Sequence, residues 1–348
     1  MHIFKKNEII GCELAVAITI KDVALLAGVS ASTVSRVISD NPRISDATKK
    51  NVRCAMKELN YHPNVIARSL ANKKTKTIGL ILPSIDEDLF INPFFAKVMR
   101  GISLYAEKEG YYIIYTYSDN EQDELMHIEK LINGRLVDGI ILAMVRKNDA
   151  CIKYLKDVKH PFVVIGKSEN TEEVCFVDND NFHATYEVVN YLLKKGKRQI
   201  AFIGGSKDLN VTIDRMEGYK KALQNCGVSI NNCMIEEADF TEQSGYEAMN
   251  KILEMQIPSA VVTTDDILAI GVIKAIEEKQ LKDIDVVGFN NTLIAKYHRP
   301  SITSVEINGE KLGYYAVKLL INQLNDIDVE IKNYIVETKL IERESTKI

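Results

Sequence analysis

Between residues 19 and 62, apolar residues recur at spacings of three and four, which is the period of one buried face of an α-helix. Residues that start or stop helices divide the stretch into three parts. In the middle part, "SASTVSRVIS", Val34, Val37 and Ile38 form a narrow apolar face. We therefore predict three short helices, with caps at Thr19 and Ser45, a stop at Gly28 and a break before Pro63.

From residue 77 onward the pattern changes to short apolar runs rich in β-branched residues, which amphipathic helical stretches separate. Runs that are apolar at nearly every position indicate parallel strands covered by helices on both faces. Two such arrays are expected, followed by a further strand and helix and by a last strand. The predicted fold class is α/β, with an all-α part in front. Typical runs are "TIGLILP", "DGIILAM", "FVVIGK", "RQIAFIGG" and "IDVVGFNN".

Polar residues follow these runs. In an open α/β sheet, a ligand binds in the crevice beyond the carboxyl ends of the strands. Asp and Asn side chains there can bind sugar hydroxyls, Arg can form a pair of hydrogen bonds, and an aromatic ring can cover the apolar face of a sugar. Several polar ends at one edge indicate a site for a small polar ligand. The ends are "PSIDED", "SDNEQD", "GKSE", "DNDN", "GGSKD", "TTDD" and "FNNT".

Charge is distributed unevenly along the chain. The 348 residues carry a formal net charge of -4, which by itself predicts no nucleic-acid partner. Residues 19–76, however, contain 11 Lys and Arg against four Asp and Glu. A basic N-terminal part joined to an acidic remainder suggests that this part contacts phosphates.

Several other classes of protein are disfavoured. No apolar run approaches the ~20 residues of a membrane span, and no signal-peptide cleavage site follows the first residues. The six cysteines lack the spacing of zinc ligands, so we expect no metal, no cofactor, and buried thiols in a reducing cytoplasm. Neither a P-loop nor a G-x-S-x-G motif occurs, so no enzyme activity is expected.

The stretch "AGVSASTVSR" has the spacing of a helix-turn-helix. Gly28 can supply the left-handed turn residue, and Val29 can fill the turn. A helix in the major groove needs small side chains near its start and a donor such as Arg for guanine. The stretch is therefore interpreted as a DNA-reading helix, with four side chains facing outward: Ala31, Ser32, Ser35 and Arg36.

The segment "TIKDVALLAGVSASTVSRVISDNPRISDATKKNVRCAMKELNYHPNVIARSLANKKTKTIGLILP" closely resembles the N-terminal part of the lac-repressor/gal-repressor (LacI/GalR) family. The resemblance extends over about residues 19–345. Within the family, "FIGGSKDLNVTIDRMEGY" and "TTDDILAIGV" most resemble the maltose-operon repressors of Gram-positive bacteria. The resemblance implies a helix-turn-helix headpiece, a hinge helix, and a two-lobed core like that of the periplasmic sugar-binding proteins.

Pattern and resemblance together predict the domain organisation. The first 18 residues are expected to be a disordered or artefactual extension. The headpiece and the two core lobes follow, and each lobe is expected to contain two separate segments. The predicted ranges are 1–18 for the extension, 19–62 for the headpiece, 63–76 for the hinge, 77–166 with 299–325 for the first lobe, and 167–298 with 326–348 for the second.

The resemblance also implies roles in DNA binding. Leu70 matches the leucine that wedges between base pairs in the minor groove and kinks the duplex. A linker residue that covers apolar surface is the structural alternative. The residues implied for the headpiece are Thr19, Ser30, Ala31, Ser32, Thr33, Ser35 and Arg36, and those implied for the hinge are Asn64, Ala67, Arg68 and Leu70.

Effector binding is implied for a second set of residues. Arg215 matches the family arginine that binds effector oxygens, and Phe240 matches an aromatic residue that stacks on the ligand. Asp265 and Asn290 match polar strand ends that bind hydroxyls, although Asp265 can also be a helix cap. Asn290 stands where the family often has Asp, which leaves the sugar preference open. The remaining candidates are Asn92, Phe94, Asp119 and Lys167.

The resulting hypothesis is a homodimeric repressor that binds a pseudo-palindromic operator and responds to a small sugar, expected to be maltose or a maltodextrin. One alternative is a catabolite-control regulator of the same family, governed by a phosphorylated carrier protein, which requires a basic surface near residues 299–330. A sugar-binding transport component is a remote alternative. The basic headpiece disfavours it.

Overall fold

The computed structural model contains two compact units, residues 1–75 and residues 76–348. The sequence placed this division one residue later, at the end of the predicted hinge segment 63–76. Residues 1–17 of the predicted extension and residues 63–73 of the predicted hinge lie outside the described residues. The structure describes residues 18–62, 74–83, 93–118, 120–168, 173–327 and 332–347.

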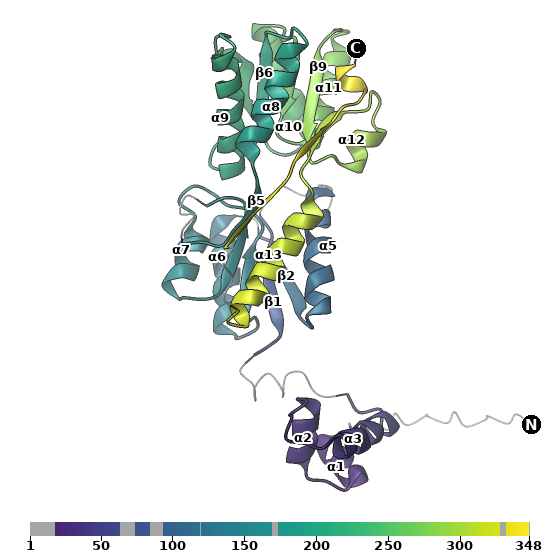
Figure 1. Cartoon of the computed structure of the whole chain (residues 1–348). Helices are drawn as coiled ribbons and strands as arrows, with labels where there is room; N and C mark the ends of the chain where they lie inside the picture. The colour runs from purple at the N-terminus through teal and green to yellow at the C-terminus, as the bar shows by residue number, and fades with distance from the viewer. Residues whose placement is uncertain are drawn as a thin grey trace, which may run out of the picture. The chain divides into compact units, whose positions relative to one another are not determined.

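Three helices form the described part of the N-terminal unit, as predicted. The Asp22 carboxylate accepts hydrogen bonds from the N–H and the hydroxyl of Thr19 (2.8 and 2.7 Å). The hydroxyls of Ser30 and Ser45 accept N–H groups from the first turns of the next two helices. Gly28 ends the first helix at a φ of +65°, which glycine adopts without strain. The helices are α1 (Ile20–Ala27), α2 (Ala31–Ile38) and α3 (Asp46–Glu58) (Figure 1).

A small apolar core holds these helices together. Val23 from α1, Val34 from α2 and Val52 from α3 are completely buried in it. Asn51 donates from Nδ2 to the carbonyl oxygen of Ala27 (2.8 Å), which ties α3 to the end of α1. The apolar face of α2 is buried in this core, and Ser32, Ser35 and Arg36 on the same helix are exposed.

The first lobe of the core unit is built on a parallel sheet, whose described strands follow the order β11-β5-β4-β3-β1-β2. These strands are β1 (Thr77–Ile81), β2 (Tyr112–Thr116), β3 (Gly139–Leu142), β4 (Phe162–Ile165), β5 (Phe176–Asn179) and β11 (Asn333–Val336). Helices cover both faces of the sheet: α5 (Pro93–Lys108) and α13 (Gly309–Leu324) on one, α6 (Glu121–Asn133) and α7 (Ala150–Asp157) on the other.

The second lobe repeats this arrangement with strand order β12-β10-β9-β8-β6-β7, in which only the β10–β12 pair is antiparallel. Its strands are β6 (Ile200–Gly204), β7 (Ile235–Glu237), β8 (Ala260–Thr263), β9 (Asp285–Phe289), β10 (Thr303–Glu306) and β12 (Lys339–Ile341). Its helices are α8 (Asn181–Lys194), α9 (Asn210–Asn225), α10 (Glu242–Met255), α11 (Asp266–Glu278) and α12 (Leu293–Tyr297), with short 3-10 turns at Asn232–Met234 and Glu344–Thr346. The predicted α/β fold class is confirmed.

The division of the chain between the lobes differs from the prediction. β5, expected in the second lobe, pairs with β4 in the first sheet, and β11, also expected in the second lobe, pairs with β5. β10, expected in the first lobe, pairs with β9 in the second sheet. The ranges 167–298, 299–325 and 326–348 are therefore wrong as undivided pieces of one lobe. The chain crosses between the lobes after β5, after β10 and after β11, and the last crossing is visible as the long yellow connection in Figure 1.

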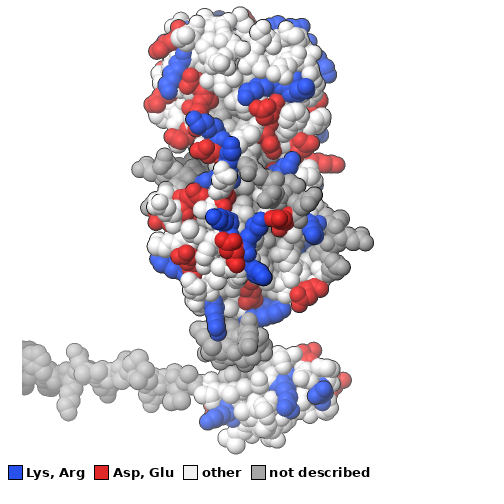
Figure 2. Space-filling model, turned by 90° about the vertical axis from the view of Figure 1, so that its left-hand side faces the viewer, with Lys and Arg blue, Asp and Glu red and all other residues white. Residues whose placement is uncertain are grey.

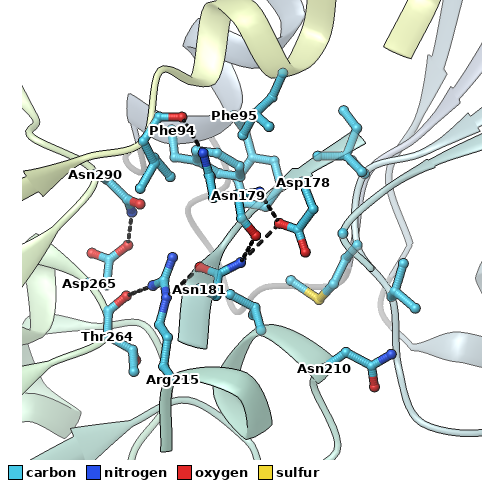
Figure 3. Close-up of a pocket in the computed structure, with 18 of the residues that line it drawn as sticks. Phe94, Phe95, Asp178, Asn179, Asn181, Asn210, Arg215, Thr264, Asp265 and Asn290 are labelled. Carbon is cyan, nitrogen blue, oxygen red and sulfur yellow. Dashed lines mark hydrogen bonds between the residues drawn. The ribbon is translucent and has the colours of Figure 1, made fainter. Parts of the chain in front are cut away.

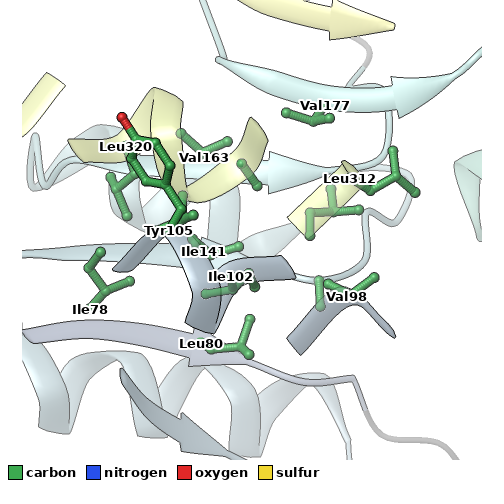
Figure 4. Packing of buried hydrophobic residues seen from close by; sticks show 14 of the residues in the cluster. Ile78, Leu80, Val98, Ile102, Tyr105, Ile141, Val163, Val177, Leu312 and Leu320 are labelled. Carbon is green, nitrogen blue, oxygen red and sulfur yellow. The ribbon is translucent and has the colours of Figure 1, made fainter. Parts of the chain in front are cut away.

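Helices α5 and α13 pack against each other so closely that their backbones touch. A Cβ on Gly101 would lie 1.9 Å from the carbonyl oxygen of Glu310, and one on Gly313 would lie 2.1 Å from that of Val98. Glycine at both positions permits this approach. Below the helix pair, apolar side chains fill the space above the sheet, among them Ile78, Leu80, Ile102, Ile141, Val163, Val177 and Leu320 (Figure 4).

Three further observations concern the described residues. None of their helices has the length and apolar character needed to cross a membrane. No three His, Cys, Asp or Glu side chains among them are grouped as metal ligands. Cys151 is buried, but Cys54 and Cys226 are exposed, so the expectation of buried thiols is wrong for these two.

Candidate functional site

A cavity lies between the two lobes of the core unit, where strands of both sheets end (Figure 3). Its volume is about 700 Å³, including the space at its open mouth. Clefts between lobes that are lined by apolar residues and a few polar groups are where small molecules commonly bind. The second lobe contributes side chains that follow β8 and β9 and the first turns of α9, and the first lobe contributes residues of β5 and of the loop after β3. Among the described residues, three of the seven polar ends that the sequence offered contribute polar side chains to this cavity: "DNDN", "TTDD" and "FNNT".

Arg215, on α9, is the most constrained of the cavity residues, with 5% of its surface exposed. Its Nε donates to Oδ1 of Asn181 (2.9 Å), and its Nη1 donates to the carbonyl oxygen of Thr264 (2.6 Å). The guanidinium also lies 4.1 Å from the ring centre of Phe289. Burial lowers the pKa of Arg215 to about 10, while Asp178 and Asp265 favour its charged form. The group is thus held as a cation that points into the cavity (Figure 3).

Asp265 and Asn290 end the neighbouring strands β8 and β9. Asn290 donates from Nδ2 to one carboxylate oxygen of Asp265 (2.6 Å), and the other oxygen accepts the N–H of Ile267 (2.7 Å). Asp265 is therefore the N-cap of α11 and at the same time a wall of the cavity. The cap is therefore observed, and the predicted contact between Asp265 and an effector stays a prediction that its place in the cavity wall allows.

The first lobe places a second carboxylate in the wall. Asp178, in β5, accepts hydrogen bonds from the N–H groups of Lys167 and Asn179 (both 2.7 Å) and from Nδ2 of Asn181 (2.9 Å). Burial raises the pKa of Asp178 to about 6. Asp178, Asn179 and Asn181 belong to the predicted polar end "DNDN", but none of them was named individually as an effector residue. The signal was present, because a carboxylate and amides inside a buried strand require partners.

Aromatic rings complete the lining. Phe94 and Phe95 come from the first turn of α5, with ring centres 5.0 Å apart, and Phe240 follows β7. Gly205 makes room for Phe240, because a Cβ on Gly205 would lie 2.4 Å from that ring. Rings beside carboxylates and amides form the kind of surface that binds the apolar and polar sides of a sugar.

The N-terminal unit presents a different surface. On α2, the side chains of Ser32, Ser35 and Arg36 are exposed and that of Ala31 is half-buried. The Ser30 hydroxyl lies 2.9 Å from the Thr33 hydroxyl, so both take part in the helix cap. On the face shown in Figure 2, this unit carries several Lys and Arg, with Asp and Glu only at one margin. The hinge candidates Asn64, Ala67, Arg68 and Leu70 lie outside the described residues.

Comparison with known proteins assigns the family. Residues 19–64 match bacterial regulatory proteins of the lacI family, and residues 189–346 match a periplasmic binding protein-like domain. The HTH-type transcriptional regulator MalR of Streptococcus pneumoniae is 42% identical over 316 residues, which span 89% of this chain and 93% of MalR. The chain belongs to the LacI family. The resemblance predicted from the sequence is confirmed.

Solved structures of transcriptional regulators share the fold of this chain. The lac repressor dimer bound to operator and the anti-inducer ONPF superimposes with a TM-score of 0.83 at 26% identity, and covers 94% of this chain and 99% of that chain. The complex of the transcriptional regulator CelR with cellobiose gives a TM-score of 0.74 at 29% identity, with the same coverages. A lac repressor has thus been solved with an operator, and a transcriptional regulator of similar fold has been solved with cellobiose.

The predicted effector residues of this LacI-family chain are only partly brought together. Five of them line the cavity: Phe94, Arg215, Phe240, Asp265 and Asn290. Lys167 does not line it. Its side chain is exposed, and its backbone meets the site through the N–H that binds Asp178 and the carbonyl oxygen that accepts Nδ2 of Asn210. Asn92 and Asp119 lie outside the described residues.

Proposed function

We propose that this chain is a homodimeric transcriptional repressor, whose affinity for a pseudo-palindromic operator is controlled by maltose or a maltodextrin. The observation that carries the proposal is the cavity between the lobes, in which Arg215, Asp178 and Asp265 face a space bordered by aromatic rings. The same chain contains both this cavity and a helix-turn-helix unit. We place the protein in the cytoplasm and assign it no enzyme activity.

The N-terminal unit supports operator binding. Helix α2 exposes short polar side chains and one arginine, Arg36, while its apolar face is buried. A helix of this kind can approach the floor of the major groove, where a guanidinium donates to guanine O6 and N7. Two copies of the unit would read two half-sites, so the operator should be a pseudo-palindrome.

The charge balance of the cavity supports a neutral ligand. One cation, Arg215, lines it together with two carboxylates, Asp178 and Asp265, and all three are at least nine-tenths buried. A phosphorylated sugar would add negative charge to a site that already has an excess of it, which is costly at low dielectric. A neutral sugar offers hydroxyls to these groups at no such cost.

Exposed apolar side chains on the first lobe support a dimer. Strand β2 is at the edge of its sheet, where Tyr112 is 62% exposed and Tyr115 is 51% exposed. Leu104 on α5 is also about half exposed. An uncovered edge strand with large apolar side chains is a surface that a partner chain commonly covers. A second copy of this chain is the partner we assign to it.

The alternative of control by a phosphorylated carrier protein requires a basic surface near residues 299–330. The described residues there carry both signs of charge, such as Lys311 and Lys318 beside Glu306 and Glu310. Arg100 of α5 pairs with Glu310 at 3.1 Å. This mixture supports a sugar effector over a phosphoprotein.

Gel retardation of a palindromic operator fragment tests the proposal. The full-length protein should shift the fragment at low salt, and maltose or maltotriose should change the apparent affinity. Sugar can act only if it binds the DNA-free and DNA-bound forms with different affinities. No shift at low salt would refute DNA binding, and a shift unchanged by every maltodextrin would refute the effector. A pull-down with the phosphorylated carrier distinguishes the alternative.

A further inference from the structure

The two lobes are joined by main-chain hydrogen bonds at the edge of the cavity. The extended segment 145–147 of the first lobe lies antiparallel to the segment 208–210 of the second, around the pair Arg146 and Leu209. The N–H of Lys147 donates to the carbonyl oxygen of Asp208 (2.8 Å), and the N–H of Asn210 donates to that of Val145 (3.2 Å). We call these two bonds the inter-lobe clamp.

The clamp lies directly beside the ligand space, because Val145 and Asn210 both line the cavity. The Asn210 side chain adds a further bond between the lobes, from Nδ2 to the carbonyl oxygen of Lys167 (2.9 Å). The lobes cannot separate at this edge without breaking these bonds. Opening the cavity at this edge to admit a ligand therefore requires the clamp bonds to break.

A buried ion pair holds the first-lobe side of the clamp. The guanidinium of Arg146 binds both carboxylate oxygens of Glu124 (2.7 and 2.8 Å), and Glu124 is 4% exposed. The N–H of Arg146 donates to the carboxylate of Asp149 (3.1 Å), which also caps α7. A bidentate pair fixes orientation as well as distance. Arg146 thus sets the direction in which the N–H of Lys147 and the carbonyl of Val145 face the other lobe.

Helix α9 holds the second-lobe side. Asn210 is the first residue of α9, where a backbone N–H has no partner inside the helix. In this structure the N–H group of Asn210 donates to the carbonyl oxygen of Val145 instead. The clamp therefore uses an N–H group that makes no hydrogen bond within helix α9.

We propose that the inter-lobe clamp holds the lobes closed over the cavity and so strengthens sugar binding, with Arg146 as its positioning residue. The part that concerns sugar rests on the proposed function. A ligand that binds the closed form gains apparent affinity in proportion to the closed fraction. Each bond contributes about 0.5–1.5 kcal/mol, so losing one should reduce the closed-to-open ratio about 2- to 10-fold.

A pair of variants isolates one clamp bond. Asn210→Pro deletes the N–H, and proline is accepted at the first position of a helix. The preceding Leu209 already has an extended backbone (φ -87°, ψ 125°), as a residue before proline requires. Asn210→Ala keeps the N–H but removes the same side chain. The difference between the two variants therefore reports the main-chain bond to Val145 alone.

Hydrogen–deuterium exchange of the ligand-free, full-length protein is the first measurement. The amide of Lys147 should exchange about 2- to 10-fold faster in Asn210→Pro than in Asn210→Ala. Arg146→Lys keeps the charge but loses the bidentate geometry, so it should speed exchange of the Asn210 amide in the other lobe. A purely local role of Arg146 would leave that amide unchanged.

Calorimetric titration with maltose is the second measurement. The dissociation constant should be higher for Asn210→Pro than for Asn210→Ala by the factor by which the closed fraction falls, which is at most about 10-fold. Equal exchange of Lys147 in the two variants would overturn the clamp, and a measurable fall in the closed fraction with equal dissociation constants would overturn its role in affinity. If the unaltered protein binds no maltodextrin, the proposed effector fails, and the exchange experiment still decides whether the clamp holds the lobes.

Discussion

Replacing Arg215 with methionine should destabilise the core unit strongly. The substitution removes a buried cation that makes hydrogen bonds of 2.9 and 2.6 Å and favourable charge interactions with Asp178 and Asp265. Removing one partner from a buried charge network costs about 3–5 kcal/mol, because the remaining charges lose their compensation. We expect a loss of this size in the free energy of unfolding near neutral pH. A sugar that binds the cavity should also bind the variant more weakly.

The size of this loss should depend on pH. The pKa of Asp178 is raised to about 6 in the folded protein, mainly by burial, and Arg215 holds it below the value that burial alone would give. In Arg215→Met the pKa of Asp178 should therefore rise further. A carboxyl whose folded pKa lies above its unfolded value binds protons more tightly when folded, so the free energy of unfolding falls as pH rises through that interval. The variant should lose more stability than the parent between about pH 5 and pH 8.

Urea unfolding followed by far-ultraviolet circular dichroism can measure this, since the chain has no tryptophan. Near pH 8, the free energy of unfolding should be about 3–5 kcal/mol lower for Arg215→Met than for the parent. Near pH 5, this difference should be smaller by about 1.4 kcal/mol for each unit by which the substitution raises the pKa of Asp178. Arg198→Met, at an exposed arginine of the same lobe, should change stability by less than about 0.5 kcal/mol. The reasoning would be refuted if the free energies of unfolding of the parent and Arg215→Met differed by less than about 1 kcal/mol, or if their difference did not change with pH.

Three further outcomes are expected. Lys97→Met removes bonds of 3.3 and 3.1 Å from α5 to carbonyls of the 290–291 turn, so the maltose dissociation constant should rise about 2- to 10-fold in calorimetry. Arg36→Met should weaken operator binding about 5- to 150-fold in gel retardation. Asn51→Ala removes the 2.8 Å bond to Ala27 and should lower the unfolding free energy of the N-terminal unit by about 1 kcal/mol.

Matched substitutions at exposed positions provide the controls. Lys108→Met on α5 should leave the maltose dissociation constant unchanged, and Cys54→Ala should leave the stability of the N-terminal unit within about 0.5 kcal/mol. Lys57→Met should weaken operator and random DNA equally, whereas Arg36→Met should weaken operator more. If Arg36→Met affects both DNAs equally, Arg36 contacts phosphate rather than a base.

The three described helices of the N-terminal unit could be predicted from the sequence. Their boundaries depend on Thr19, Gly28 and Ser45, and each of these acts on the backbone within a few residues of itself. Their core depends on the helical spacing of Val34 and its neighbours. Such signals are local, so a single sequence contains them in full.

The assignment of strands to lobes could not be predicted in the same way. β5, β10 and β11 have the pattern of strands, but nothing in that pattern identifies the neighbours with which they pair. Strand pairing is a contact between residues distant in sequence, such as Asn333 with Phe176. The same limit applies to Lys167, where the resemblance indicated the correct loop, but the contact is made by the backbone N–H and not by the side chain.

Asp265 shows why a cap and a ligand contact are not competing interpretations in this fold. In a parallel sheet each strand ends at the edge where ligands bind, and the next helix begins a few residues later. Residues that cap these helices therefore lie at the ligand edge. In Asp265 one oxygen accepts the N–H of Ile267, and the other accepts the amide of Asn290 in the cavity wall. The bond to Asn290, which follows the neighbouring strand β9, is what distinguishes Asp265 from a residue that only caps a helix.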